Sequence, residues 1–190
     1  IFSKLIAQAT SISERQVTGT IGLLEEGCTI PFISRYRKEA TGALDEVQVA
    51  SISDQLEKLK ELEKRKETIL KTIEEQGKLS EELKTRISQS WDSTELEDLY
   101  LPYKPKRKTR AEAARQKGLE PLALAIFAQN GEDPAELAKD YIDPEKGVET
   151  LEDALAGASD IIAEMISDDA DIRKALRQKM ERQAVITVTA

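Results

Sequence analysis

The most restrictive feature of this sequence is the stretch 46–76, where apolar residues recur every three or four positions among Glu and Lys residues. This spacing is typical of an amphipathic α-helix. Asp45 is suited to cap its start and Gly77 to end it. At about 1.5 Å per residue the helix would be about 46 Å long, too long for one small domain to cover, so we expect it to act as a strut. One position, Lys66, interrupts the apolar stripe, and too few clean heptads remain to favour a coiled coil. The stripe consists of Val49, Ile52, Leu56, Leu59, Leu62, Ile69 and Ile73.

A helix-turn-helix-like unit is predicted ahead of the long helix. Residues 1–9 carry apolar side chains at the spacing of one helix face. Ser13 and Gln16 match a capping box for a second helix over 14–26, whose end is marked by Gly27. DNA-reading modules and ordinary helical bundles share this layout, so it leaves both interpretations open. The residues predicted to face inward in the second helix are Val17, Ile21 and Leu24.

Signals for helix starts recur through the rest of the chain. Ser80 precedes an apolar pattern that ends at Trp91, and Ser93 or Thr94 is suited to cap the next helix. Trp91 is the only tryptophan, and we expect it to lie in the core or to pin one helix against the long helix. The apolar residues 122–127 predict a helix that is buried on most faces. Later helix signals are Asp133 before Pro134, Asp143 before Pro144, Thr150 with Asp153, and the apolar stripe Ile172, Leu176 and Met180.

The chain is therefore expected to be all-α and to divide into four parts. Residues 1–44 form short helices, and residues 45–77 form the long central helix. Residues 78–183 form a helical domain with a basic loop at 101–110. Residues 184–190 are β-branched without a partner strand in this sequence, so we interpret them as a terminal strand that starts the next, absent domain.

Catalytic and metal chemistry find little support in the composition. The sequence has no histidine and one cysteine, Cys28, which excludes disulfides, thiolate zinc clusters and imidazole bases within this chain. Neither a G-x-x-x-x-G-K-[ST] loop nor a G-x-G-x-x-G turn occurs. We expect a protein that is not an enzyme and that uses no cofactor and no metal.

The net charge of −8 hides an uneven distribution. Residues 132–171 contain fourteen acids and two lysines, which leaves the remainder of the chain net basic. An acidic protein can therefore still attract nucleic acid, since it is the local electrostatic potential, and not the net charge, that attracts phosphate. No apolar run approaches the roughly 20 residues of a membrane span, and the first residues do not resemble a signal peptide. These features predict a cytoplasmic protein without a membrane partner.

The basic segment, residues 101–110, carries the strongest functional signal. It places five cations within seven residues, while Pro102 and Pro105 keep the backbone extended. Thr109 with Glu112 predicts a capping box, so a short helix over 110–117 should follow and present its positive end and free amides. This combination suits phosphate. The five cations are Lys104, Lys106, Arg107, Lys108 and Arg110.

A second basic cluster, Arg35, Arg37 and Lys38, follows a short helix that begins near Pro31. These cations could simply complement the dipole at the carboxyl end of that helix. They could also join the basic segment as two halves of one phosphate-binding surface. Both interpretations remain open from the sequence.

Two long runs resemble the N-terminal region of the Tex family of bacterial transcription accessory proteins. They are TIPFISRYRKEATGALDEV at 29–47 and the region 96–122, which contains DLYLPYKPKRKTR. The resemblance implies an all-helical part of a larger cytoplasmic protein that binds RNA and DNA. The family's RNase H-like domain, helix-hairpin-helix units and S1 domain are not found in this sequence, and the S1 domain would be expected to supply much of the affinity.

We therefore expect a non-enzymatic module that contacts RNA or DNA phosphates without strong sequence preference. Its expected contacts are the five cations of the basic segment, with help from Arg35, Arg37 and Lys38. The alternative is a protein-interaction scaffold that docks to RNA polymerase, to other transcription or translation machinery, or to the other domains of the full-length protein.

Overall fold

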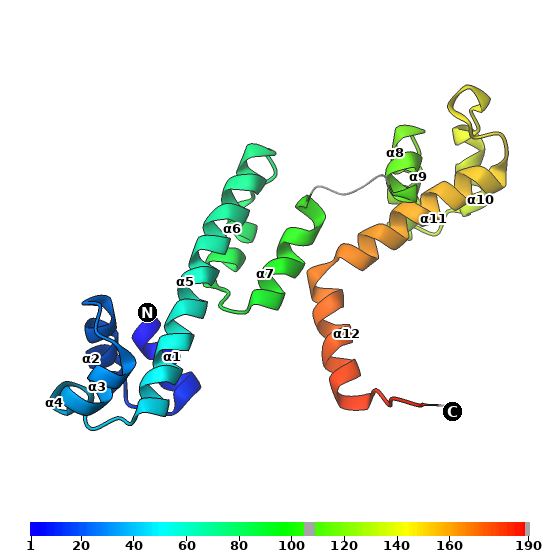
Figure 1. The fold of residues 1–190 in the computed structure, drawn as a ribbon. Coiled ribbons are helices and arrows are strands. Elements are labelled where there is room, and N and C mark those ends of the chain that lie inside the picture. Colours follow the sequence, from blue (N-terminus) through cyan, green and yellow to red (C-terminus); the bar gives the residue numbers. More distant parts are fainter. Residues whose placement is uncertain (105–108, 189–190) are drawn as a thin grey trace. The chain divides into compact units, whose positions relative to one another are not determined.

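The computed structural model describes residues 1–104 and 109–188 and confirms the all-α prediction. Within these ranges the chain forms twelve α-helices and three short 3-10 turns, and no sheet (Figure 1). The helices fall into two compact units, Ile1–Trp91 and Asp92–Ala190.

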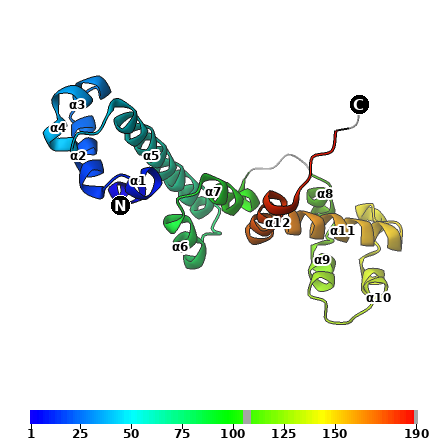
Figure 2. The same cartoon turned by 90° about the horizontal axis from the view of Figure 1, so that it is seen from below.

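The first unit gathers four short helices at the start of the long helix α5, as Figure 2 shows. Helices α1, α2 and α3 each contact α5, and α4 packs against α2 and α3. Their shared core includes Ile6, Val17, Ile33, Val49 and Ile52. The four helices are α1 (Phe2–Thr10), α2 (Glu14–Glu25), α3 (Ile30–Tyr36) and α4 (Lys38–Thr41).

Helix α2 is turned slightly from the predicted orientation. Its fully buried positions are Val17, Thr20 and Leu23, whereas the predicted inward residues Ile21 and Leu24 are half-buried. Burial of Thr20 is tolerated because its hydroxyl donates a hydrogen bond of 2.9 Å to the carbonyl oxygen of Gln16. The hydroxyl thus finds its hydrogen-bond acceptor within the same helix, so Thr20 can be buried although the periodicity of apolar residues does not predict it.

The long helix is α5 (Glu46–Glu75), and its predicted start at Asp45 is confirmed. The Asp45 carboxylate accepts a hydrogen bond from the backbone N–H of Gln48, and the Gln48 side-chain oxygen accepts one from the backbone N–H of Asp45, which completes a capping box. The predicted stripe is buried at every position except Leu62, which is partly buried.

Lys66 interrupts the stripe but is itself buried, with 6% of its surface exposed. Its Nζ donates a 3.0 Å hydrogen bond to the carbonyl oxygen of Ser88 and lies 3.4 Å from the centre of the Trp91 ring. Removal from water lowers the pKa of this amine. Trp91 also meets the Phe2 ring edge to face at 5.7 Å. Lys66 thus joins α5 to α6 (Glu81–Gln89) through Ser88 and to Trp91 just after that helix, in agreement with the role predicted for this tryptophan.

The second unit is organised around α11 (Leu151–Asp168), which contacts α8, α9 and α10. The capping box of Thr150 and Asp153 that starts α11 is confirmed. The core of the second unit includes Ala111, Ala114, Leu122, Ala158 and Ile161. The other helices are α7 (Ser93–Tyr100), α8 (Arg110–Gln116), α9 (Glu120–Phe127), α10 (Pro134–Ala138) and α12 (Ala170–Gln183). The 3-10 turns are η1 (Leu101–Tyr103), η2 (Lys139–Tyr141) and η3 (Pro144–Lys146).

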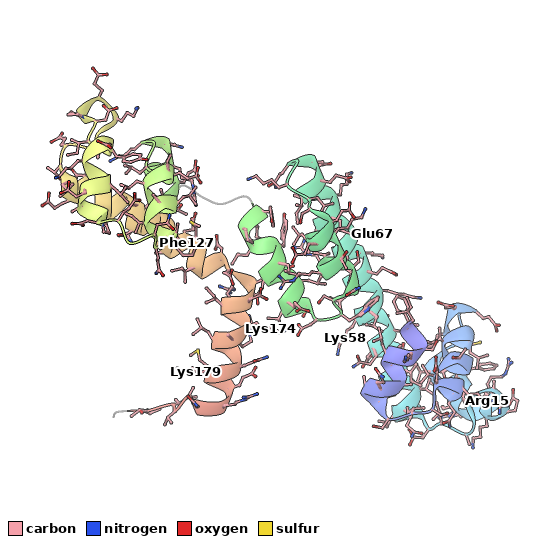
Figure 3. All side chains as sticks on the ribbon, turned by 180° about the vertical axis from the view of Figure 1, so that it is seen from behind. Arg15, Lys58, Glu67, Phe127, Lys174 and Lys179 are labelled. Carbon is pink, nitrogen blue, oxygen red and sulfur yellow. The ribbon has the colours of Figure 1, made fainter. Side chains whose placement is uncertain are left out.

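Two local predictions in the second unit are wrong. Helix α7 is capped by Asp92 rather than by Ser93 or Thr94, since the Asp92 carboxylate accepts from the N–H groups of the second and third helical residues. Helix α9 is not buried on most faces, because Leu124 and Phe127 are about half exposed (Figure 3 labels Phe127).

Helix α12 is attached to α7 mainly by charge. Asp98 of α7 is 5% exposed, and its two carboxylate oxygens accept hydrogen bonds from Arg173 Nε at 2.7 Å and Arg177 Nη2 at 2.8 Å. Burial by itself would raise the pKa of Asp98, but the bonds from the two guanidinium groups outweigh it and lower the pKa. Lys174 adds a more exposed pair with Glu95 at 3.0 Å. The apolar stripe Ile172, Leu176 and Met180 therefore lies exposed.

The terminal strand is not formed within the described residues. Residues 184–188 have no regular structure, and Val185, Ile186 and Val188 are almost fully exposed. The described chain provides no other strand with which they could form a ladder. Pairing with a domain outside this chain stays a prediction.

Candidate functional site

The centre of the basic segment, with Lys106, Arg107 and Lys108, lies outside the described residues, and the structure describes both of its flanks. On one side η1 continues directly from α7 and ends at Tyr103. On the other side Thr109 caps α8. The described flanks of the segment thus adjoin two helices of the second unit, α7 and α8.

Lys104, at the amino-terminal flank, lies on the surface with about half of its side chain exposed. Its Nζ is 3.7 Å from a carboxylate oxygen of Glu97 in α7. Such a long contact between exposed groups is a weak ion pair that salt screens. The amine therefore stays accessible to another anion.

Arg110, at the other flank, is 88% exposed, and its Nη2 is 3.4 Å from a carboxylate oxygen of Asp160 in α11. Because this guanidinium is almost entirely in solvent, the pair restrains it little. Arg110 and Lys104 are consequently both available at the ends of the basic segment.

The capping box predicted at the start of α8 is only half formed. Thr109 Oγ1 accepts a 3.0 Å hydrogen bond from the backbone N–H of Glu112, as predicted. Its hydroxyl donates to Glu164 of α11 at 3.0 Å, and no return bond from the Glu112 side chain is present among the described residues. The carboxylates of Asp160 and Glu164 therefore lie beside the start of α8 and offset its positive end. The start of α8 is therefore a poor anion site by itself, and the exposed positive charge at this flank comes from the side chain of Arg110.

Arg115, which also belongs to α8, is committed to structure. Its Nη1 donates a 2.6 Å hydrogen bond to Glu164, and its Nε is 3.4 Å from Glu120. Burial alone would lower the pKa of Arg115, but the bond to Glu164 outweighs it and raises the pKa. Arg115 thus ties α8 to α11.

The second basic cluster surrounds the junction between α3 and α4. Arg35 and Lys38 are exposed, and the guanidinium Nε of Arg37 donates a 3.0 Å hydrogen bond to Glu39. Arg35 lies in the last turn of α3, where a cation also complements the helix dipole. This cluster belongs to the first unit, whereas Lys104 and Arg110 belong to the second. A single surface made from both clusters stays a prediction.

Two exposed aromatic residues, Phe32 and Tyr36, lie beside this cluster. Ile33 of α3 is fully buried, but Phe32 and Tyr36 are 42% and 68% exposed. Their ring centroids are 5.5 Å apart. The four-residue spacing predicts that the two rings meet on one face, but it does not predict that this face points to solvent.

Metal and membrane sites find no support in the ranges that the structure describes. No three Cys, His, Asp or Glu side chains there are arranged to hold a metal ion. Among the same residues no helix has both the length and the apolar character to cross a bilayer.

These features define a class of protein: an all-helical chain of two units with cations clustered at a helix junction in each. Residues 2–74 match the family model of the Tex-like protein N-terminal domain, and residues 129–190 match the Tex central region-like model. The chain belongs to the Tex family. The basic segment lies between the two matched regions.

Three relatives illustrate this similarity. Protein tex of Bordetella pertussis is 48% identical over 181 residues, which are 94% of this chain and 23% of that protein. Transcriptional accessory protein Tex of Neisseria gonorrhoeae is 43% identical over 184 residues, 97% of this chain and 24% of that protein. S1 RNA-binding domain-containing protein 1 of Pongo abelii is 38% identical over 169 residues, 87% of this chain and 17% of that protein. The chain thus spans about a quarter of the length of the bacterial relatives.

Proposed function

We propose that this chain is a non-enzymatic module of a cytoplasmic transcription accessory protein that binds RNA or DNA through backbone phosphates. The observation that carries the proposal is the density of cations in the basic segment, whose two described members, Lys104 and Arg110, are at least half exposed. Contacts from Lys and Arg to phosphate provide affinity without sequence information, so we expect no strong sequence preference.

The names of the relatives support a role around nucleic acid. One relative is called a transcriptional accessory protein, and another is called an S1 RNA-binding domain-containing protein. Because this chain spans only part of their length, their names do not place the contact on this chain. The basic segment is our assignment for it.

The ion pairs at the flanks are compatible with phosphate binding. Exposed pairs such as Lys104 with Glu97 and Arg110 with Asp160 contribute about 0–1 kcal/mol each. A phosphate can therefore replace the carboxylate at small cost. Helix α2, the second helix of the predicted helix-turn-helix-like unit, is less suited, since its exposed residues include Glu14 and Glu25 beside Arg15.

A second candidate function is a protein-interaction scaffold, and the exposed stripe of α12 favours it. Ile172, Leu176 and Met180 recur at four-residue spacing and are 38–64% exposed. Such a stripe is the usual anchor pattern of a helix that docks into an apolar groove. RNA polymerase, other transcription or translation machinery, and the remaining domains of the full-length protein are the candidate partners in this case.

A salt titration distinguishes the two functions. Labelled single-stranded RNA and duplex DNA are titrated with the native chain and with a triple variant, Lys106→Ala, Arg107→Ala and Lys108→Ala. The matched control changes three exposed lysines of the first unit, Lys58 (Figure 3), Lys64 and Lys84, to Ala, which removes the same charge.

Phosphate binding by the basic segment predicts a log–log salt slope of about −3 to −5 for the native chain. The triple variant at Lys106, Arg107 and Lys108 should make the slope shallower, while the control variant retains it. Equal losses in the two variants would assign the effect to net charge rather than to the basic segment. Absence of binding at low salt would favour the scaffold.

A further inference from the structure

Helix α3 exposes two aromatic rings in a chain that is poor in them. Only 4% of the residues are aromatic, yet Phe32 and Tyr36 leave 42% and 68% of their surfaces in solvent. Their ring planes are tilted by 43° and their centroids lie 5.5 Å apart. Two neighbouring exposed rings are a common feature of binding surfaces, because the hydrophobic effect otherwise favours their burial.

The rings point outward because of the way α3 packs. Ile33 and Ser34 are buried, and α3 contacts α5. Residues at i, i+3 and i+4 share one helix face, so Phe32, Arg35 and Tyr36 lie together on the exposed side. We call these three residues the α3 face.

The chain segment that carries the α3 face is positively charged. Residues 29–38 contain three cations and no acid. The nearest following acid, Glu39, accepts a hydrogen bond from Arg37, which leaves Arg35 and Lys38 exposed without an ion pair among the described residues. A partner of this face must therefore combine flat rings with negative charge. Nucleotides carry both.

We propose that Phe32 and Tyr36 form a stacking platform for unpaired bases, with Arg35 and Lys38 holding the adjacent phosphates. This inference rests on the proposed function and narrows it to single-stranded nucleic acid, because the bases of a duplex already stack on one another. The tyrosine is the principal platform, since it is the more exposed ring.

Abasic strands separate stacking from phosphate contact. The 190-residue chain is titrated with a labelled 12-nucleotide single strand and with an abasic strand of the same length and charge. Stacking predicts that the native chain binds the base-bearing strand about fivefold or more tightly than the abasic strand. The double variant Phe32→Ala, Tyr36→Ala should lose this difference and keep the affinity for the abasic strand.

Two further variants test the role of the rings themselves. The double variant Phe32→Leu, Tyr36→Leu keeps apolar side chains but removes the π-faces, so it should also lose the preference. The swap Phe32→Tyr, Tyr36→Phe keeps both rings and should retain it. The emission of Trp91, the only tryptophan, checks that the first unit stays folded in every variant.

Several results would overturn the platform. If the native chain binds both strands with equal affinity, the stacking proposal is refuted and the phosphate-binding proposal stands. If it binds neither strand, both proposals are refuted. Retention of the preference in the leucine variant would show an apolar contact instead. If a poly-glutamate peptide binds with the same dependence on Phe32 and Tyr36, the α3 face is a surface for an acidic protein segment.

Discussion

Helix α2 contains two glycines whose replacement by alanine should affect stability differently. A Cβ built on Gly22 meets nothing within 4 Å, whereas a Cβ on Gly19 would lie 2.3 Å from the carbonyl oxygen of Ala40 in α4. That obstacle is backbone, which cannot rotate away as a side chain can. Helices α2 and α4 would have to move apart by about 1 Å to restore ordinary van der Waals contact.

The difference in the free energy of unfolding between the two variants follows from two contributions, helix propensity and overpacking. Replacement of a helical glycine by alanine stabilises by about 1 kcal/mol, and this gain is common to both variants. Overpacking costs about 1–3 kcal/mol and applies to Gly19→Ala only. The free energy of unfolding of the first unit should therefore be about 1–3 kcal/mol lower in Gly19→Ala than in Gly22→Ala.

Urea unfolding followed by Trp91 emission measures this difference, because Trp91 packs in the first unit. A Gly19→Ala variant as stable as Gly22→Ala would refute the close approach of α2 and α4. The contact also bears on the candidate site, since α4 begins at Lys38 and determines where the cluster of Arg35, Arg37 and Lys38 lies.

Three further predictions concern buried charge. Asp98→Asn should weaken the attachment of α12 by about 2 kcal/mol, because one guanidinium bond is lost and the arginines remain partly solvated. Hydrogen exchange of the α12 amides should then be about 30-fold faster. The control Lys174→Ala, which removes an exposed ion pair, should change this exchange little. An equal effect of the two changes would contradict this attachment. Folding lowers the pKa of Asp98 below its ordinary value of 3.8, so the stabilisation of α12 by the ionised carboxylate is complete above that pH and should disappear as the pH falls through the folded pKa. Hydrogen exchange of α12 measured at several pH values checks this. Lys66→Ala should lower the urea midpoint and shift Trp91 emission to the red, since the ring loses the ammonium group that lies over it. An unshifted spectrum would argue against that contact.

Local signals predicted the helices well because capping is a local interaction. Ser13, Asp45 and Thr150 each accept a hydrogen bond from an N–H group three residues later in the chain, as predicted, although the box predicted at Ser13 is only half formed, since Gln16 Oε1 accepts from the Ser13 hydroxyl. The exception is α7, where Asp92 rather than its neighbours caps the helix. Several suitable cap residues in succession leave the choice to the backbone conformation.

The candidate site was only partly predictable. The sequence places the cations of the basic segment but does not show that Asp160 and Glu164, about fifty residues later, lie beside the start of α8. The exposure of Phe32 and Tyr36 was also not predicted, because periodicity tells which residues share a face and not which face meets the core.

The sequence by itself determined the all-α class, the long helix, the family resemblance and the positions of the two basic clusters. Tertiary structure decided which chemically suitable residues are available. Lys66 is buried in the apolar stripe because Ser88 and Trp91 satisfy it, whereas the apolar stripe of α12 is exposed because α12 is bound through a different face, by Arg173 and Arg177 to Asp98. The physical reason is that helix formation depends on neighbours within about four residues, while burial depends on partners brought together by folding.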